Sequence, residues 1–129
     1  MKILLLLAVL VPTHFICCQA AWADSTKQKL SIETLDDRLI VRFGELEIAH
    51  YVFQDPEVPR PYFAHVKTRG GTQATRNHPP VEGQDKTDHK TIHPGIWMAF
   101  GDLDGEDFWR NKASIQHVKF IETPHASDN

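Results

Sequence analysis

The sequence of 129 residues contains little cysteine, and both of its cysteines, Cys17 and Cys18, lie close to the N-terminus. The rest of the chain therefore cannot form a disulfide framework, a thiolate nucleophile or a zinc site built on thiolates. Stability has to come from buried apolar surface. Any metal site in this part of the chain would have to use histidine and carboxylate ligands.

The sequence also lacks an excess of basic residues, because its formal net charge is −3 at pH 7. Proteins that bind DNA or RNA rely on a basic face that neutralises phosphates. This chain offers no such excess, so we do not expect a nucleic-acid partner. We expect its ligand to be a small molecule or a saccharide.

Long apolar runs are absent after the first residues, where 3–11 form one apolar stretch behind Lys2. This stretch is shorter than the ~20 residues that span a bilayer. Ala21-Trp22-Ala23 has the small-x-small form that signal peptidase accepts. The sequence therefore predicts a signal peptide over residues 1–23, a mature chain 24–129 without a membrane span, and a secreted or periplasmic location.

A lipoprotein signal that uses Cys17 or Cys18 is the alternative interpretation of the N-terminus. Ile16 precedes Cys17, and Phe15 and His14 lie further back. These are not the small and leucine-like residues that such a signal usually needs, so we favour the cleaved secretory signal.

Helix signals are also scarce, because prolines interrupt the chain from Pro56 to Pro124. Residues 38–43 and 45–53 instead alternate apolar and polar side chains on either side of Gly44, as strands of a hairpin do. Gly70-Gly71 and Asp104-Gly105 are typical turn sequences. We expect further strands over 62–68, 72–76, 95–103, 106–109 and 113–123. About seven or eight strands predict an all-β fold, an antiparallel β-sandwich.

The long polar segment 77–94 is the first candidate for a functional site, because loops of this length are usually functional or disordered. Four histidines lie in or near it, together with acidic residues: His65, His78, His89, His93, Glu82, Asp85 and Asp88. Imidazole and carboxylate groups bind zinc, copper and iron. One hypothesis is therefore a copper or zinc site with His65, His89 and His93 as ligands and Asp88 orienting a ring. The alternative is a solvated loop with His93 bonded to the backbone.

The segment DHKTIHPGIW, residues 88–97, separates into two groups by chemistry. Pro94, Gly95 and Trp97 suit a structural role: a fixed φ, a backbone turn and an anchor in the core. No structural need explains Asp88, His89 and His93. We predict them as catalytic residues, since imidazole exchanges protons near neutral pH.

Three further side chains are candidates for binding a ligand. Arg60 and Arg76 could clamp an anionic group, and Trp97 could stack on a sugar ring. The alternatives are ordinary surface charges for the two arginines and a core position for the tryptophan.

The chain resembles the bacterial family known as methane oxygenase PmoA-like. The resemblance covers residues 30–122 and rests on an RPYF segment, a T-R pair, a histidine-rich stretch ending in tryptophan, and a G-D-x-x-G-x-D-F-W tail. The matching residues are Arg60, Pro61, Tyr62, Phe63, Thr75, Arg76, Asp88, His89, His93, Gly95, Trp97, Gly101, Asp102, Gly105, Asp107, Phe108 and Trp109, with His117 as a further match.

The resemblance implies a secreted β-sandwich domain that is longer than this chain, so that residues 24–129 would form its N-terminal part. It also implies an association with polysaccharide degradation, whereas the family label points to an oxygenase. Three hypotheses follow. The chain binds or processes a carbohydrate-derived ligand, or is a metal-dependent enzyme or oxygenase, or is a fragment that needs a partner or has no function.

Overall fold

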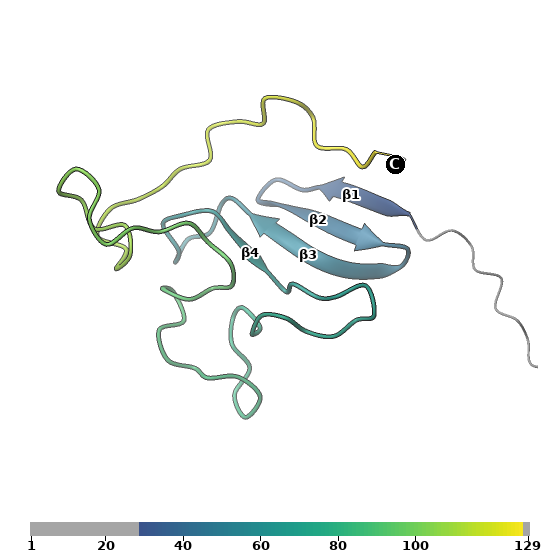
Figure 1. Ribbon diagram of the computed structural model, residues 1–129, viewed down its shortest axis with the longest axis horizontal. Coiled ribbons are helices and arrows are strands. Elements are labelled where there is room, and N and C mark those ends of the chain that lie inside the picture. The colour runs from purple at the N-terminus through teal and green to yellow at the C-terminus, as the bar shows by residue number, and fades with distance from the viewer. Residues whose placement is uncertain (1–28, 128–129) are drawn as a thin grey trace, which may run out of the picture.

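The computed structural model describes residues 29–127 and contains one antiparallel sheet, β1-β2-β3-β4 (Figure 1). Its strands are β1 (Leu30–Thr34), β2 (Arg38–Phe43), β3 (Leu46–Val52) and β4 (Tyr62–Ala64). Within these residues there is no helix, and hence none with the length and apolarity to cross a membrane. The predicted signal segment 1–23, with the two cysteines of the lipoprotein alternative, lies outside the described residues.

The hairpin of β2 and β3 has the predicted turn. Phe43 pairs with Leu46 across the two residues Gly44 and Glu45, and Gly44 has a φ of 60°, which glycine adopts without strain. The alternating side chains explain why these strands pair. β1 was not predicted from the sequence. The segment LSIET has only five residues and is largely exposed in the structure, yet it pairs with β2 along its whole length.

The connector between β3 and β4 is folded by Asp55. Its Oδ1 accepts hydrogen bonds from the backbone N–H groups of Glu57 and Val58, at 2.7 and 3.0 Å. This turn directs the Val58 side chain into the core. The core cluster of Val52, Val58, Tyr62 and Ala64 is completed by Trp97, which packs against it.

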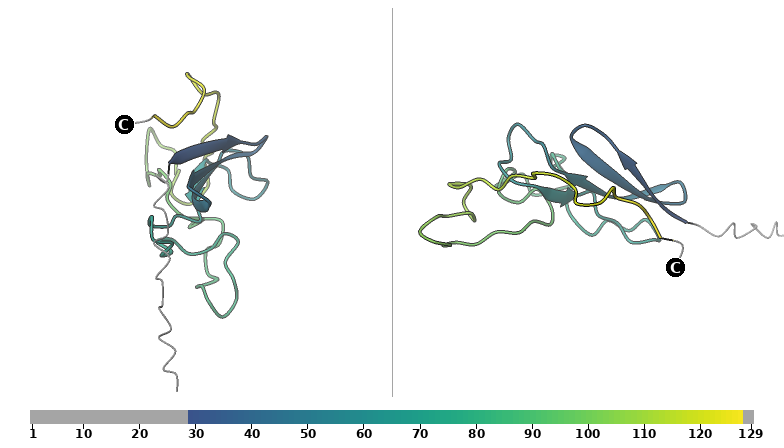
Figure 2. Two further views of the ribbon diagram at one scale, coloured as in Figure 1. Left: turned by 90° about the vertical axis from the view of Figure 1, so that its right-hand side faces the viewer. Right: turned by 90° about the horizontal axis from the view of Figure 1, so that it is seen from above.

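The expected sandwich is not shown, because the described residues form only the one sheet (Figure 2). Of the further strands expected, 62–68 forms only the short β4, and 72–76, 95–103 and 106–109 contribute isolated bridges: Lys67 with Gln73, Phe63 with Ile96, and Leu103 with Glu106. The two expected hairpin turns are nevertheless present at 68–72 and 103–106. Residues 97–102 and 113–123 are not strands here, since no neighbouring strand pairs with their backbone groups.

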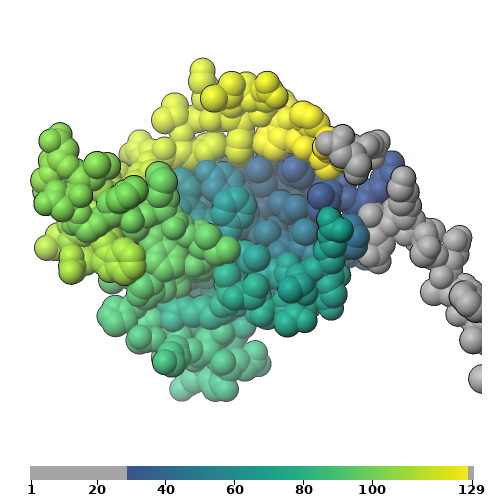
Figure 3. Space-filling model, viewed as in Figure 1, coloured from purple at the N-terminus to yellow at the C-terminus, as the bar shows by residue number. Residues whose placement is uncertain are grey.

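The C-terminal segment crosses beside the sheet, and Figures 1 and 3 show it in yellow along one side of the molecule. The rings of His117 and Phe120 contact Tyr51 and Phe53 at the end of β3. Other apolar side chains of this segment find little cover, and Val118 and Ile121 are 87% and 94% exposed. Irregular chain, and not a second sheet, therefore lies beside this sheet within the described residues.

Candidate functional site

Some of the predicted site residues meet at an open cavity of about 600 Å³, which we call the loop cavity. It is lined by Ala74, Thr75, Arg76, Gln84, Asp85, Lys86, Asp88, His93 and Gly95. Three of the predicted site residues, Arg76, Asp88 and His93, are among them. The lining is rich in hydroxyl, amide and charged groups, which can hydrogen-bond a polar ligand.

Arg76 braces this loop from within. Its Nε donates to the carbonyl of His93 at 3.0 Å, and its Nη2 donates to that of His89 at 3.1 Å. Its Nη1 donates to the carbonyls of Lys86 and Asp88, at 2.6 and 2.9 Å. A guanidinium whose N–H groups are mostly occupied in this way has little capacity left for a ligand. Arg76 therefore positions the loop, and its binding of an anionic group stays a prediction.

Arg60 is likewise turned inward, with a side chain that is buried. Its guanidinium donates to the carbonyls of Phe108 at 2.7 Å and Trp109 at 3.3 Å, and lies 5.6 Å from the centre of the Trp97 ring. Burial lowers the pKa of Arg60. These contacts do not favour the predicted role of Arg60 in ligand binding. The guanidinium instead holds residues 108–109 against the end of the connector between β3 and β4.

His89 and His93 are brought together by a single hydrogen-bonded turn. The N–H of His93 donates to the carbonyl of His89 at 2.9 Å, and the two ring centres lie 5.8 Å apart. The expectation of no helix here is confirmed, and His89 has a φ of 48°. The i, i+4 spacing nevertheless brings the rings close, because one turn is enough to do so.

An aromatic group borders His93. Its ring centre lies 5.0 Å from that of Trp97 and 6.1 Å from that of Trp109. Trp97 is partly buried against the core, whereas Trp109 is 44% exposed. Trp109 can therefore offer a ring to a ligand at this cavity, whereas Trp97 lines a separate hollow of about 570 Å³, and its predicted binding role stays a prediction.

Asp88 and His89 form a carboxylate–imidazole pair, with Oδ2 and Nδ1 3.1 Å apart. The hydrogen bond with His89 lowers the pKa of Asp88, which is therefore ionised at neutral pH. A carboxylate that orients an imidazole is the arrangement that general-base catalysis uses. Both side chains are exposed, so water reaches the pair freely.

The structural role of Pro94 and Gly95 agrees with the sequence interpretation. Pro94 is fully buried. A Cβ on Gly95 would lie 2.0 Å from the carbonyl oxygen of Phe63, a distance that no side chain can occupy. Phe63 and Ile96 exchange backbone hydrogen bonds at 2.7 and 2.8 Å, and this close approach requires glycine.

His65 belongs to a second group of histidines. Its ring centre lies 5.0 Å from that of His50, and His65 and His78 both line a smaller cavity of about 280 Å³. We call it the Asp55 cavity; it is also lined by Arg38, Val52, Asp55, Pro56, Glu57, Tyr62, Ala64, Pro79 and Lys90. Sequence reasoning counted His78 among the histidines but did not connect it with Asp55 and Tyr62.

Burial changes the chemistry of this second group. Burial lowers the pKa of His65, with a further contribution from His50, and burial also lowers the pKa of His78 against the attraction of Asp55. Burial raises the pKa of Tyr62, and its hydrogen bond to Asp55 raises it further. Burial alone would raise the pKa of Asp55, but hydrogen bonds from Tyr62 and from the backbone outweigh this effect and lower the pKa.

The donor geometry does not support the copper or zinc site. Within residues 29–127 no group of three or more histidine, cysteine, aspartate or glutamate side chains is arranged to hold a metal ion. His89 and His93 lie together, whereas His65 lies with His50 and lines the Asp55 cavity. We therefore derive no step through a metal.

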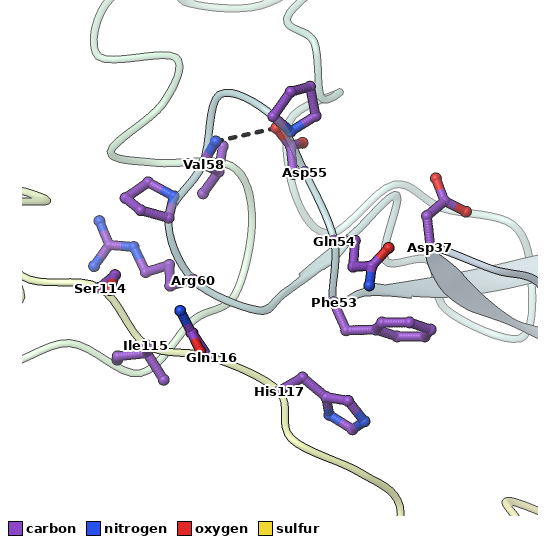
Figure 4. A pocket seen from close by; sticks show the side chains of 12 residues that line it. Asp37, Phe53, Gln54, Asp55, Val58, Arg60, Ser114, Ile115, Gln116 and His117 are labelled. Atoms are coloured by element: carbon purple, nitrogen blue, oxygen red, sulfur yellow. Dashed lines mark hydrogen bonds between the residues drawn. The ribbon is translucent and has the colours of Figure 1, made fainter.

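A third and larger hollow, of about 740 Å³, lies between the connector and residues 114–117 (Figure 4). In Figure 4 the Arg60 guanidinium lies at the Ser114 end and the Gln54 amide points towards Asp37. The rings of Phe53 and His117 border it, 5.0 Å apart. Its polar groups are spread over a wide opening, and Arg60 is engaged elsewhere, so they do not converge on one point.

The comparisons with known proteins give one match. Residues 38–129 match the model of a family described as a family of unknown function (DUF6807). No curated protein and no solved structure matches the chain. The match covers well over half of the sequence, and the PmoA-like label inferred from the motifs is a finer statement that this match does not show.

Proposed function

Because the chain belongs to the DUF6807 family of unknown function, we propose its activity from the geometry: it binds a saccharide-type ligand at the loop cavity. The N-terminal segment adds the proposal that it does so as a secreted or periplasmic protein. The motifs shared with the PmoA-like family support the same ligand class, because that resemblance implies an association with polysaccharide degradation.

One observation carries this proposal: polar groups and an exposed aromatic ring occur side by side. The loop cavity presents Asp88, Gln84 and Thr75, and His93 connects it to Trp109. A sugar ring has hydroxyl groups at its edge, which hydrogen-bond to carboxylate and amide groups, and apolar C–H faces, which stack on aromatic rings. The volume of about 600 Å³ is in the range of small-ligand sites.

In this proposal the two arginines are positioning residues. Arg76 holds the carbonyls of Lys86, Asp88 and His89, so the side chains of the loop are oriented before a ligand arrives. Asp88 and His89 supply a proton-transfer pair at the rim of the cavity, should the ligand be processed as well as bound.

The test is a binding screen of neutral oligosaccharides against the full chain by titration calorimetry. For any ligand found, Trp109→Ala and Asp88→Ala should each weaken binding by about tenfold or more, which corresponds to ~1.4 kcal/mol. Arg69→Ala is a matched surface control, because Arg69 is exposed and contacts Phe43 instead. Binding that is unchanged in both loop variants would exclude the loop cavity as the site.

A second candidate function is favoured by the exposed apolar side chains. Ile96, Met98 and Phe100 are exposed in a segment that pairs with β4 only at Ile96, and Val118 and Ile121 are also exposed. Ile96, Met98 and Val118 border one hollow of about 570 Å³ together with Tyr51, Phe63 and Trp97. We infer that a partner chain can cover this apolar surface and complete a β-sandwich, since contiguous apolar surface usually marks an interaction site. Met98→Lys with Val118→Lys should then abolish a complex seen by sedimentation. A chain that sediments as a monomer at every concentration and with every partner tested would contradict this candidate.

A further inference from the structure

The two carboxylates that line the loop cavity already have partners within the chain. Asp85 accepts hydrogen bonds from the backbone N–H groups of Asn77 and Val81, at 3.1 and 2.8 Å, and from the side-chain amide of Asn77 at 2.9 Å. Asp88 is paired with Nδ1 of His89 at 3.1 Å. The negative charge of each carboxylate is therefore stabilised by donors of the same loop.

The two cations that line the cavity differ from each other. The guanidinium of Arg76 donates to four backbone carbonyls and lies 3.7 Å from a carboxylate oxygen of Asp88. The ammonium group of Lys86 has no hydrogen bond and no ion pair within the described residues, although Lys86 is exposed and lines the same cavity. The carbonyl of Lys86 accepts from Nη1 of Arg76 at 2.6 Å, so this flexible side chain starts from a fixed point of the cavity wall.

Further donors of the cavity are also free. The side-chain amide of Gln84 and the ring nitrogens of His93 make no hydrogen bond within the part of the chain that the structure describes. Oγ1 of Thr75 accepts from the backbone N–H of Val66 at 3.2 Å, so its own O–H is left to donate. A group with several acceptor lone pairs, such as a carboxylate, can use these donors together with the ammonium group of Lys86.

We propose that the saccharide of the loop cavity is acidic, with an anionic group on its sugar ring that accepts hydrogen bonds from the ammonium group of Lys86. This inference rests on the proposed function, because it names the class of saccharide that the same site binds. The anionic group is the counter-ion that Lys86 lacks, while the C–H face of the sugar stacks on the exposed ring of Trp109. The carboxylate of a uronic acid and a sulfate ester have this chemistry in common.

The test compares an oligogalacturonic acid with its methyl ester, which has the same sugar rings without the charge, by titration calorimetry on the full chain at neutral pH. We expect the acid to bind at least about tenfold more tightly, because hydrogen bonds to charged groups contribute more than those to neutral groups. High salt should weaken the binding of the acid and leave that of the ester unchanged.

A second pair of ligands identifies the anionic group. If a sulfated oligosaccharide binds more tightly than its desulfated form while the acid gains nothing over its ester, the group is a sulfate ester and the inference stands. Equal affinity of the charged and neutral forms in both pairs would overturn the inference.

Substitutions of Lys86 assign the preference to this residue. Lys86→Met should remove the advantage of the charged ligand and leave the binding of the neutral one unchanged, whereas Lys86→Arg should retain the advantage. Lys119→Met is the matched control, because Lys119 is an exposed lysine that does not line the loop cavity. A preference that persists in Lys86→Met, or an equal loss in Lys119→Met, would contradict the role of Lys86.

The outcomes separate this inference from the proposed function. If neutral oligosaccharides bind with the expected dependence on Trp109 and Asp88 but a charge on the ligand gains nothing, the proposed function stands and this inference fails. If a charged ligand binds through Lys86 while Trp109→Ala and Asp88→Ala have no effect, the sugar contacts of the proposed function fail and the anion contact stands. If no saccharide binds, both fail.

Discussion

Two carboxylate–imidazole pairs of this protein have the same residue types and different surroundings. The Asp88–His89 pair has its two atoms 3.1 Å apart, with side chains 62% and 61% exposed. The Asp55–His78 pair has a separation of 3.7 Å, with side chains 17% and 11% exposed. Burial lowers the pKa of His78, whereas the hydrogen bond with His89 lowers the pKa of the exposed Asp88. We expect the buried pair to contribute more to stability than the exposed one.

The largest expected effect on stability comes from the close approach of Gly95 to the backbone of Phe63. Gly95→Ala places a Cβ against the carbonyl of Phe63 and separates Phe63 from Ile96. We expect a loss of about 3 kcal/mol in the free energy of unfolding, measured by denaturant titration. Gly101→Ala is the control, because a Cβ there meets nothing within 4 Å. Equal losses in both variants would show that the close approach at Gly95 does not exist.

The next effect compares the two aspartates directly. Asp55→Asn replaces an acceptor of three hydrogen bonds and should cost about 2 kcal/mol. Asp88→Asn should change the free energy of unfolding by less than ~0.5 kcal/mol, since exposed ion pairs contribute little. Denaturant titrations of both variants side by side measure the difference. A larger loss for Asp88→Asn would reverse the comparison.

Acid should destabilise the protein through its buried histidines. The folded-state pKa values of His65 and His78 are lowered, so the unfolded chain binds more protons as the pH falls below about 6.5. Stability should therefore decrease as the pH falls from that value to the folded-state pKa, by up to ~1.4 kcal/mol per pH unit for each histidine. His78→Gln should reduce this slope in thermal melts, and His125→Gln should not. A slope that His78→Gln leaves unchanged would contradict the assignment to His78.

The last effect is local to the loop cavity and should leave the global free energy of unfolding nearly unchanged. Arg76→Ala should open residues 86–93, at a local cost of about 1–2 kcal/mol, because their carbonyls lose the guanidinium. Amide hydrogen exchange of this segment should become faster while the exchange of β2 and β3 stays unchanged. Arg76→Lys should not restore protection, since an ammonium cannot reach carbonyls on several sides. Full protection in Arg76→Lys would contradict the bracing role.

The sequence predicted those features that depend on neighbouring residues. The alternation around Gly44 gave the β2–β3 hairpin, and the separation of Pro94 and Gly95 from Asp88 and His93 agrees with the structure. What it could not give depends on distant contacts. Arg60 lies 48 and 49 residues before Phe108 and Trp109 in the sequence. The sequence alone therefore could not predict that its guanidinium faces their carbonyls rather than a ligand.

The prediction of a second sheet failed for the same reason, because pairing between strands depends on contacts between distant residues. Alternating apolar residues over 95–103 and 113–123 predict strands, but a strand needs a neighbour for its backbone groups. Within the described residues only Ile96 and Leu103 form isolated bridges, and residues 97–102 and 113–123 pair with no strand. The Asp55 cavity was missed for a related reason. Asp55, Tyr62 and His78 are separated in sequence, and only the turn at Asp55 and the position of β4 bring them together.

The most direct test of the central contrast is an NMR titration of all ring nitrogens of the histidines between pH 4 and 8. The account predicts that His65 and His78 become protonated below the usual value of about 6.5, because both are buried. Titration of His78 at or above that value would contradict the account. It would mean that the imidazole of His78 is open to water and that the contrast between the buried and the exposed pair is wrong.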